Sequence, residues 1–284
     1  MIVEAMNKME MKVLTAAISD VGTRKSVNQD AVMLKVAKTE AGENLILAVL
    51  CDGLGGLSHG EAASAAFVSE MEAWFVNRLP VILSGEVGTQ DLSGMSVKDD
   101  FRKAIRRSWE YLADDMNERI GAYGRRGGFQ LGTTALCLII KDHDFLLMNV
   151  GDSRLYKVTD TAEGIRQLTH DHSLVQQQID RGEITYEEAE QSANKSVLLQ
   201  CVGASERVYP DFFYGNITRD TSYLLCSDGF WRRLSLEELE RGIKPSVCID
   251  EARLSQNLTD MTECAKRRGE EDNISAVLIT CRVE

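Results

Sequence analysis

The chain has 284 residues, enough to bury a sizeable core without disulfide staples, and its apolar and charged fractions are ordinary for a globular protein. Its formal net charge of -12 argues against nucleic acid as a partner, because phosphate backbones require a basic surface. The seven cysteines contain no CxxC pair, which suits a reducing compartment. No apolar run approaches the ~20 residues of a membrane span, and the N-terminal residues lack a hydrophobic signal core. We therefore expect a cytoplasmic protein away from membranes.

The first half of the chain alternates short apolar runs with two long helical patterns. Three strands are predicted first: 12–19, 31–37 and 44–51. Residues 60–79 then carry apolar side chains at helical spacing, and Pro80 is expected to end that helix. The stretch 80–98 is rich in Gly, Ser and Thr and predicts a loose connection. A second amphipathic helix is predicted over 97–123, closed by Gly124.

The second half predicts more strands, a polar stretch and two short helices. The strands are expected at 132–141, 144–150, 154–158, 207–214, 221–227 and 274–281. Residues 174–203 are polar with a weak helical pattern, which is typical of a lid rather than a core element. Ser235 and Glu238 resemble a capping box, and a last helix is predicted up to Gly269. Because strands come in groups with helices between the groups, we expect one α+β domain over 1–284, with antiparallel sheets and outer helices.

Five aspartates lie next to apolar runs. They are Asp30, Asp52, Asp152, Asp228 and Asp272. A polar residue at the end of a buried strand emerges at the rim of its sheet, so several such ends would bring carboxylates together. Carboxylates that are close together cannot all stay ionised unless a cation compensates them, and hard divalent cations prefer oxygen ligands. The pattern therefore predicts a metal-centred enzyme.

The glycine-rich turn CDGLGGLSHG also allows a phosphate-binding reading. Gly53, Gly55 and Gly56 would let the backbone approach a ligand closely just before a helix. Neither GxGxxG nor the Walker pattern is present, however, so a nucleotide site is disfavoured. Each aspartate turn, taken alone, would be read as structural.

Several polar residues are expected to be structural rather than functional. His170 and His172 flank Asp171, but adjacent side chains diverge, so this run is expected to open a helix. Thr133 and Thr134 begin an apolar strand and are expected to form hydrogen bonds in the core. Arginine pairs are expected on solvated faces at 125–126, 232–233 and 267–268.

Taken in order, seven blocks resemble the type 2C metal-dependent protein serine/threonine phosphatases in their bacterial form. The blocks are RKSVNQDA, AVLCDGLGGLSHGEAAS, LGTTALCLII, NVGDSRLYKV, LTHDHSLV, LLCSDGFW and EDNISAVLI. They span roughly residues 12–281, nearly the whole chain. The resemblance implies an α-β-β-α sandwich, in which two antiparallel sheets are flanked by antiparallel helix pairs. It also implies that 174–203 is the flap beside the bacterial site.

The resemblance further implies two metal ions, Mn²⁺ or Mg²⁺, at one end of the sandwich. By the family pattern, Asp52 bridges both ions, the Gly53 carbonyl binds one, and Asp228 and Asp272 bind the other. Asp152 matches an aspartate that holds a weaker third ion in bacterial members. The implied reaction is hydrolysis of phosphoserine and phosphothreonine on proteins by water activated between the ions, without a covalent intermediate.

The residues expected around the phosphate depart from the family pattern in part. By the same resemblance, Asp30 matches an acidic position that does not hold a metal ion directly but orders metal-bound water. An arginine normally stands five residues before it; here Lys25 has that spacing and Arg24 precedes it. We favour Arg24 as the phosphate clamp, because a planar fork suits phosphate better than a point charge, and its alternative is a solvated surface role. His59 is expected at the helix entry rather than as a general acid.

These implications describe a protein phosphatase that acts on phosphorylated proteins. Because bacterial relatives commonly reverse the action of a partner Ser/Thr kinase, the resemblance also implies such a kinase as a partner. One alternative is a non-catalytic relative that binds phosphoproteins without turnover, which loss of a metal-binding aspartate would signal. No such aspartate is lost. A second alternative is a metal-dependent phosphoesterase for small molecules.

Overall fold

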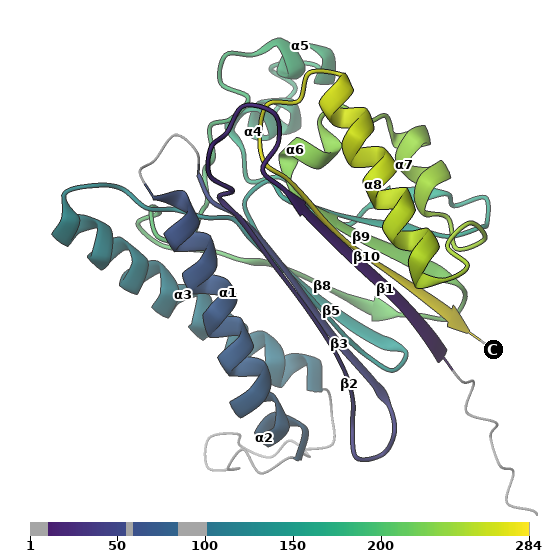
Figure 1. The fold of residues 1–284 in the computed structure, drawn as a ribbon. Helices are drawn as coiled ribbons and strands as arrows, with labels where there is room; N and C mark the ends of the chain where they lie inside the picture. The colour runs from purple at the N-terminus through teal and green to yellow at the C-terminus, as the bar shows by residue number, and fades with distance from the viewer. Residues whose placement is uncertain (1–10, 55–58, 85–100, 284) are drawn as a thin grey trace, which may run out of the picture.

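Two antiparallel sheets of five strands pack face to face in this computed structural model, which describes residues 11–54, 59–84 and 101–283 (Figure 1). The first sheet has the order β1-β10-β9-β6-β7, formed by β1 Met11–Asp20, β10 Ile274–Val283, β9 Thr221–Cys226, β6 Arg154–Val158 and β7 Ile165–Gln167. The second has the order β2-β3-β4-β5-β8, formed by β2 Asp30–Lys38, β3 Asn44–Asp52, β4 Ala135–Lys141, β5 Asp144–Val150 and β8 Asp211–Asn216. The predicted α+β sandwich is therefore confirmed.

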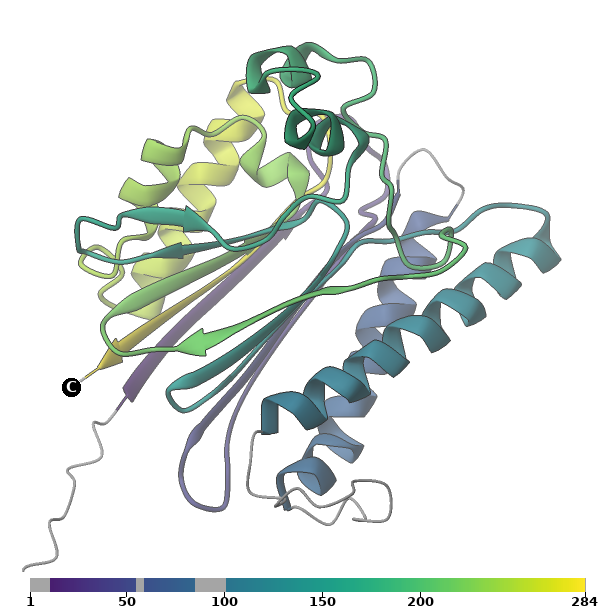
Figure 2. The same ribbon diagram turned by 180° about the vertical axis from the view of Figure 1, so that it is seen from behind.

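Helices cover the outer face of each sheet, as Figure 1 shows. The second sheet carries α1 Gly60–Asn77, α2 Leu79–Ser84 and α3 Phe101–Gly127. The first sheet carries α6 Asp228–Trp231, α7 Leu236–Ile243 and α8 Glu251–Arg267. The segment 174–203, which was expected to form the flap, contains two short helices, α4 Leu174–Asp180 and α5 Tyr186–Gln191, and these lie over one end of the sandwich in both views (Figures 1 and 2). Within the described ranges, no helix is long and apolar enough to cross a bilayer.

The continuous apolar run of β3 is explained by burial on both faces. Ile46, Ala48 and Leu50 belong to the core between the two sheets. Leu47 and Val49 point the other way and pack in the cluster shared with α1 and α3. Because successive strand residues face opposite sides, a strand that is covered on both faces needs apolar residues at every position.

The boundaries of several elements differ from the predictions. The helix expected over 60–79 ends at Asn77, shortly before Pro80. Pro80 itself lies in the first turn of the next helix, α2, where proline is tolerated because its missing N–H would have no helical partner. Gly124 is inside α3; the helix ends three residues later, before Gly128, whose φ of 73° is left-handed. Of the expected loose connection, 80–84 belong to α2, and 85–98 lie outside the described residues.

Two differences concern strands. The strand expected at 207–214 begins only at Asp211, because Pro210 precedes it and Val208 is buried in the core. The short strand β7 was not predicted; it has only three residues and pairs with β6 alone. The capping box is confirmed, since Ser235 Oγ accepts from the Glu238 N–H and the Glu238 carboxylate accepts from the Ser235 N–H.

Candidate metal centre

The site begins where β2 and β3 meet. Asp30 and Asp52 are direct partners in the antiparallel register, so two carboxyl groups lie side by side at this end of the second sheet. Thr134 fixes Asp52, because its Oγ1 accepts from the Asp52 N–H at 2.8 Å and its own N–H donates to the Asp52 carbonyl at 2.9 Å. Thr133 Oγ1 donates to the same carbonyl at 3.0 Å. The two threonines thus form the expected core hydrogen bonds, and these position Asp52.

The other carboxylates come from three different connections. Asp152 lies on the turn between β5 and β6, Asp228 starts α6 after β9, and Asp272 precedes β10. All three line one cavity of about 1100 Å³ together with Asp52 and Lys25. The predicted meeting of strand-end aspartates therefore occurs at one end of the sandwich.

Burial and mutual repulsion raise the pKa values of Asp30, Asp52 and Asp152. Burial raises the pKa of Asp30 to about 7, and the charges of Asp228 and Asp272 add to this effect. Burial, with Asp228 and Asp171 nearby, raises the pKa of Asp152 to about 8. The pKa of Asp52 is also raised, by burial first and then by Asp30 and Asp228. An added positive charge would relieve this repulsion.

Several oxygen atoms in the cluster lack hydrogen bonds. Both carboxyl oxygens of Asp30 and Oδ1 of Asp228 are buried without a partner in the part of the chain that the structure describes. Such atoms are costly to bury unless something binds them. Oxygen donors with excess negative charge are the ligands that Mg²⁺ and Mn²⁺ prefer. The residues present therefore fit a hard divalent cation.

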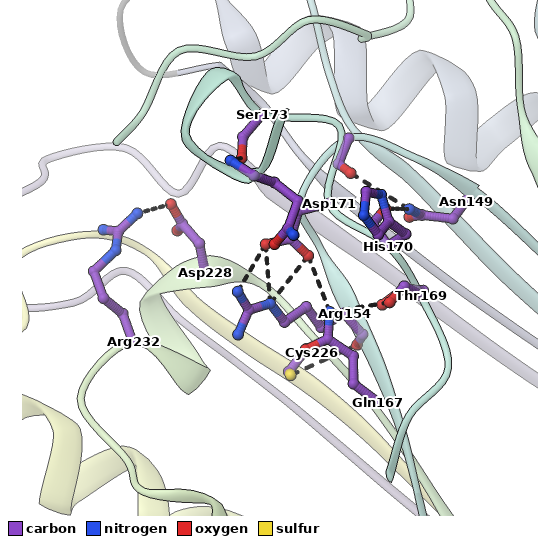
Figure 3. Close-up of polar contacts among 12 residues, drawn as sticks. Asn149, Arg154, Gln167, Thr169, His170, Asp171, Ser173, Cys226, Asp228 and Arg232 are labelled. Atoms are coloured by element: carbon purple, nitrogen blue, oxygen red, sulfur yellow. Dashed lines mark hydrogen bonds and ion pairs between the residues drawn. The ribbon is translucent and has the colours of Figure 1, made fainter. Parts of the chain in front are cut away.

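Two of the carboxylates are paired with cations of the chain itself. Arg232 Nη2 binds Asp228 Oδ2, and Lys25 Nζ lies 3.0 Å from Asp272 Oδ1; the first contact is drawn in Figure 3. Within the described ranges, no three Asp, Glu, His or Cys side chains converge as a ready-made metal-binding group. A divalent cation would therefore compete with these side-chain cations for Asp228 and Asp272.

Arg232 corrects one expectation from the sequence. The pair 232–233 was expected on a solvated face, but the Arg232 side chain is only 21 % exposed and pairs with Asp228 one helical turn away. It also approaches Glu270, a buried carboxylate. Glu270 Oε1 accepts from the N–H groups of Glu271 and Asp272, so it holds the loop that presents Asp272. Only the three-dimensional arrangement identifies these two supporting residues.

Gly53 is required by close packing between the turn and α1. A Cβ at this position would lie 2.4 Å from the Gly60 carbonyl oxygen and 2.6 Å from the Gln29 carbonyl oxygen. The Gly53 N–H donates to the same Gln29 carbonyl at 3.1 Å. Only glycine allows this approach, so the turn after β3 is held against the start of β2 and α1.

The two candidate phosphate-binding residues lie in different surroundings. Lys25 lines the cavity and is paired with Asp272. Arg24 is not among the described residues that line it; its side chain is 72 % exposed and its Nη1 lies 2.6 Å from Glu271 Oε2. Arg24 would have to leave Glu271 to reach a phosphate in the cavity.

The histidines occupy supporting positions. His59 precedes α1 and stacks edge-on against Phe129 with centroids 5.0 Å apart. His170 Nε2 lies 3.0 Å from Asp180 Oδ2 in α4. His172 Nδ1 accepts from the Gly151 N–H, and its Nε2 donates to Asp211 at 3.1 Å. The segment does open a helix, since Ser173 is the N-cap of α4, as expected.

A buried ion pair connects the base of the flap to the metal centre (Figure 3). Arg154 donates from Nε and Nη2 to the carboxylate of Asp171, with the shortest contact at 2.7 Å. The guanidinium carbon of Arg154 also lies over the ring of Trp231, 3.4 Å from its centroid. Trp231 ends α6, the one-turn helix that begins with Asp228. The pair therefore anchors the start of the segment 174–203 against the element that presents Asp228, one of the candidate metal-binding aspartates.

Comparison with known proteins gives one consistent result. A family model described as Protein phosphatase 2C matches residues 22–278. Protein phosphatase PhpP of Streptococcus pneumoniae is 27% identical over 278 residues, covering 97% of this chain and 99% of the relative. Serine/threonine phosphatase stp of Listeria monocytogenes is 29% identical over 242 residues, covering 84% of this chain and 85% of the relative.

Solved structures agree with the architecture. The serine/threonine phosphatase of S. agalactiae is 26% identical with a TM-score of 0.74, and the match covers 97% of this chain and 100% of that one. The catalytic domain of PstP, solved in complex with two manganese ions, has a TM-score of 0.71 at 23% identity and covers 96% of this chain and 100% of that one. At 23% identity, the similarity to PstP supports the fold of this chain and nothing more.

Proposed function

The chain belongs to the protein phosphatase 2C family, and from this membership we propose that it hydrolyses phosphoserine and phosphothreonine on proteins with the help of two divalent metal ions. The observation that carries the proposal is the single cavity lined by Asp52, Asp152, Asp228 and Asp272 together with Lys25. Relatives named as serine/threonine phosphatases support the substrate class.

Each carboxylate has a proposed role in holding the ions. Asp52 and the Gly53 carbonyl would hold the first ion, and Asp52, Asp228 and Asp272 the second, with a weaker third ion at Asp152. Mn²⁺ or Mg²⁺ bound there would supply Lewis acidity toward the attacking water and the phosphate oxygens. The two manganese ions in the PstP structure support this assignment.

Residues of the chain would bind the phosphate and manage the proton. We assign the phosphate contact to Lys25, because its ammonium group already lies in the cavity, and Arg24 is the alternative. Asp30 would orient the attacking water and accept its proton at an unpaired carboxyl oxygen.

We further propose that residues 1–284 act as one cytoplasmic phosphatase domain that reverses a partner Ser/Thr kinase. The apolar core shared by both sheets supports a single domain. The net charge of -12 supports a partner other than nucleic acid.

The test is a Mn²⁺-dependent assay on a phosphothreonine peptide and on a sugar phosphate, using the wild type, Asp228→Asn and Asp260→Asn. Asp260 is an exposed aspartate on α8 and serves as the matched control. We expect hydrolysis of the peptide that requires Mn²⁺, is lost in Asp228→Asn and survives in Asp260→Asn. Peptide hydrolysis that survives both EDTA and Asp228→Asn would reject the proposed mechanism. Hydrolysis of the sugar phosphate alone would indicate the small-molecule phosphoesterase, and binding without turnover the non-catalytic relative.

A further inference from the structure

The cavity has a second wall, which carries an arginine where the first wall carries the cluster of aspartates. It is formed where the chain returns from the flap toward β8, and it includes Gln200, Ser205, Arg207 and Tyr209. Of the described residues that line the cavity, only Lys25 and Arg207 carry a positive charge. Lys25 is at the carboxylate wall, so Arg207 is the cation of the second wall.

The loop that presents Arg207 is held rigidly. Asn117 of α3 accepts from the Gly203 N–H at 2.7 Å and donates to the Ser205 carbonyl at 3.1 Å. Ser205 Oγ in turn accepts from the Cys201 N–H at 2.9 Å. Val208, next to Arg207, is only 3 % exposed and packs in the core shared with α1 and α3. A side chain on such a braced loop loses little conformational freedom when it binds a ligand.

The guanidinium group of Arg207 is available for a ligand. Arg207 is exposed, and it forms no ion pair with a residue in the described part of the chain. Its guanidinium carbon lies 5.6 Å from the ring centroid of Tyr209, which is itself 60 % exposed. An arginine beside an aromatic ring keeps donors free for a second partner, and its planar fork matches a carboxylate or a phosphate. Lys25 and Arg232, in contrast, are both engaged by aspartates.

We propose that Arg207 determines substrate specificity by binding a second anionic group of the substrate, a carboxylate or another phosphate close to the scissile phosphoresidue. The inference rests on the proposed phosphatase function and adds a preferred substrate class to it. The cavity of about 1100 Å³ is as large as sites that enclose drug-sized ligands, so it accommodates a phosphorylated residue together with a neighbouring side chain. Glu206 also lines the cavity beside Arg207, so the proposal places the anionic group against the guanidinium group and away from this carboxylate.

The test compares three phosphothreonine peptides that differ only in the flanking positions: glutamates, glutamines, or a second phosphothreonine. The wild type, Arg207→Gln, Arg207→Lys and Arg219→Gln are assayed with Mn²⁺, and the measured quantity is the ratio of kcat/KM between each anionic peptide and the glutamine peptide. Arg219 is the matched control, because it is an exposed arginine that does not line the cavity. The glutamate and phosphothreonine arms distinguish which anion Arg207 prefers.

We expect the wild type to favour at least one anionic peptide and Arg207→Gln to lower that ratio about tenfold through KM, as loss of one charge-assisted contact would. Arg207→Lys should retain part of the preference, and Arg219→Gln all of it. If Arg207→Gln leaves the ratio of kcat/KM values unchanged, the inference is overturned while the phosphatase function stands. This includes the case in which kcat/KM falls by the same factor on all peptides. Failure of the wild type to hydrolyse any of the peptides overturns both.

Discussion

Replacing Asp30 by asparagine should stabilise the metal-free protein more at pH 8 than at pH 5. The folded protein holds the pKa of Asp30 at about 7, against an ordinary value of 3.8, because the carboxyl group is buried beside other carboxylates. Since the folded pKa is raised, the stability associated with protonated Asp30 is fully present below about pH 4 and is lost as the pH rises to 7. The asparagine variant lacks the contribution of Asp30 to this dependence.

The size of the effect follows from the two pKa values. The two pKa values differ by about 3, and each step of one corresponds to about 1.36 kcal/mol. Because Asp30 ionises more readily in the unfolded chain, its titration costs the folded state about 4 kcal/mol at pH 8 and about 1.5–2 kcal/mol at pH 5. The free energy of unfolding of Asp30→Asn should therefore gain about 2–3 kcal/mol on the wild type between pH 5 and pH 8. Any cost of burying the amide is the same at both pH values and cancels.

The assay is urea denaturation of EDTA-treated protein, wild type and Asp30→Asn, at both pH values. Asp260→Asn, on the exposed face of α8, provides the control and should show no change in its difference from the wild type. A difference between Asp30→Asn and the wild type that is the same at pH 5 and pH 8 would show that Asp30 titrates normally in the folded protein. The argument from burial would then be wrong.

Three further predictions concern the cations around the site. Lys25→Ala should raise KM for a phosphopeptide about tenfold, and Arg24→Ala should change it less than twofold, because of these two residues only Lys25 lines the cavity. Steady-state kinetics that show the reverse would assign the phosphate contact to Arg24. Arg154→Ala should lower the free energy of unfolding by about 3–5 kcal/mol, because it leaves the buried carboxylate of Asp171 unpaired; urea denaturation showing a loss below ~1 kcal/mol would contradict this. Arg232→Gln should tighten Mn²⁺ binding measured by calorimetry, because it removes the cation that is paired with Asp228, a proposed metal ligand. Weaker binding would count against that competition.

Local signals in the sequence were sufficient for most of the fold. The run of β3 and the capping box of Ser235 and Glu238 depend on neighbouring residues alone, so they could be identified without knowing the tertiary structure. The convergence of Asp52 and Asp228 could be anticipated because each ends a buried strand. Their family roles came from the order of the motifs.

What the sequence did not reveal depends on contacts between distant residues. Arg232 looked like half of a solvated pair until α6 brought its guanidinium to Asp228. Glu270 supports Asp272 through backbone hydrogen bonds that leave no periodic pattern. The choice between neighbouring side chains Arg24 and Lys25 depends on which way each points, and a sequence carries no such direction.

The stacking of Trp231 on Arg154 gives the protein an intrinsic optical reporter. Of the three tryptophans, Trp74 and Trp109 pack against each other beneath α1 and α3, on the far side of the second sheet. Trp231 is in the same short helix as Asp228 and stacks on Arg154, so we expect its indole emission to change when the charge or position of that carboxylate changes. Fluorescence titrations with divalent cations can therefore follow events at the catalytic end without an attached dye.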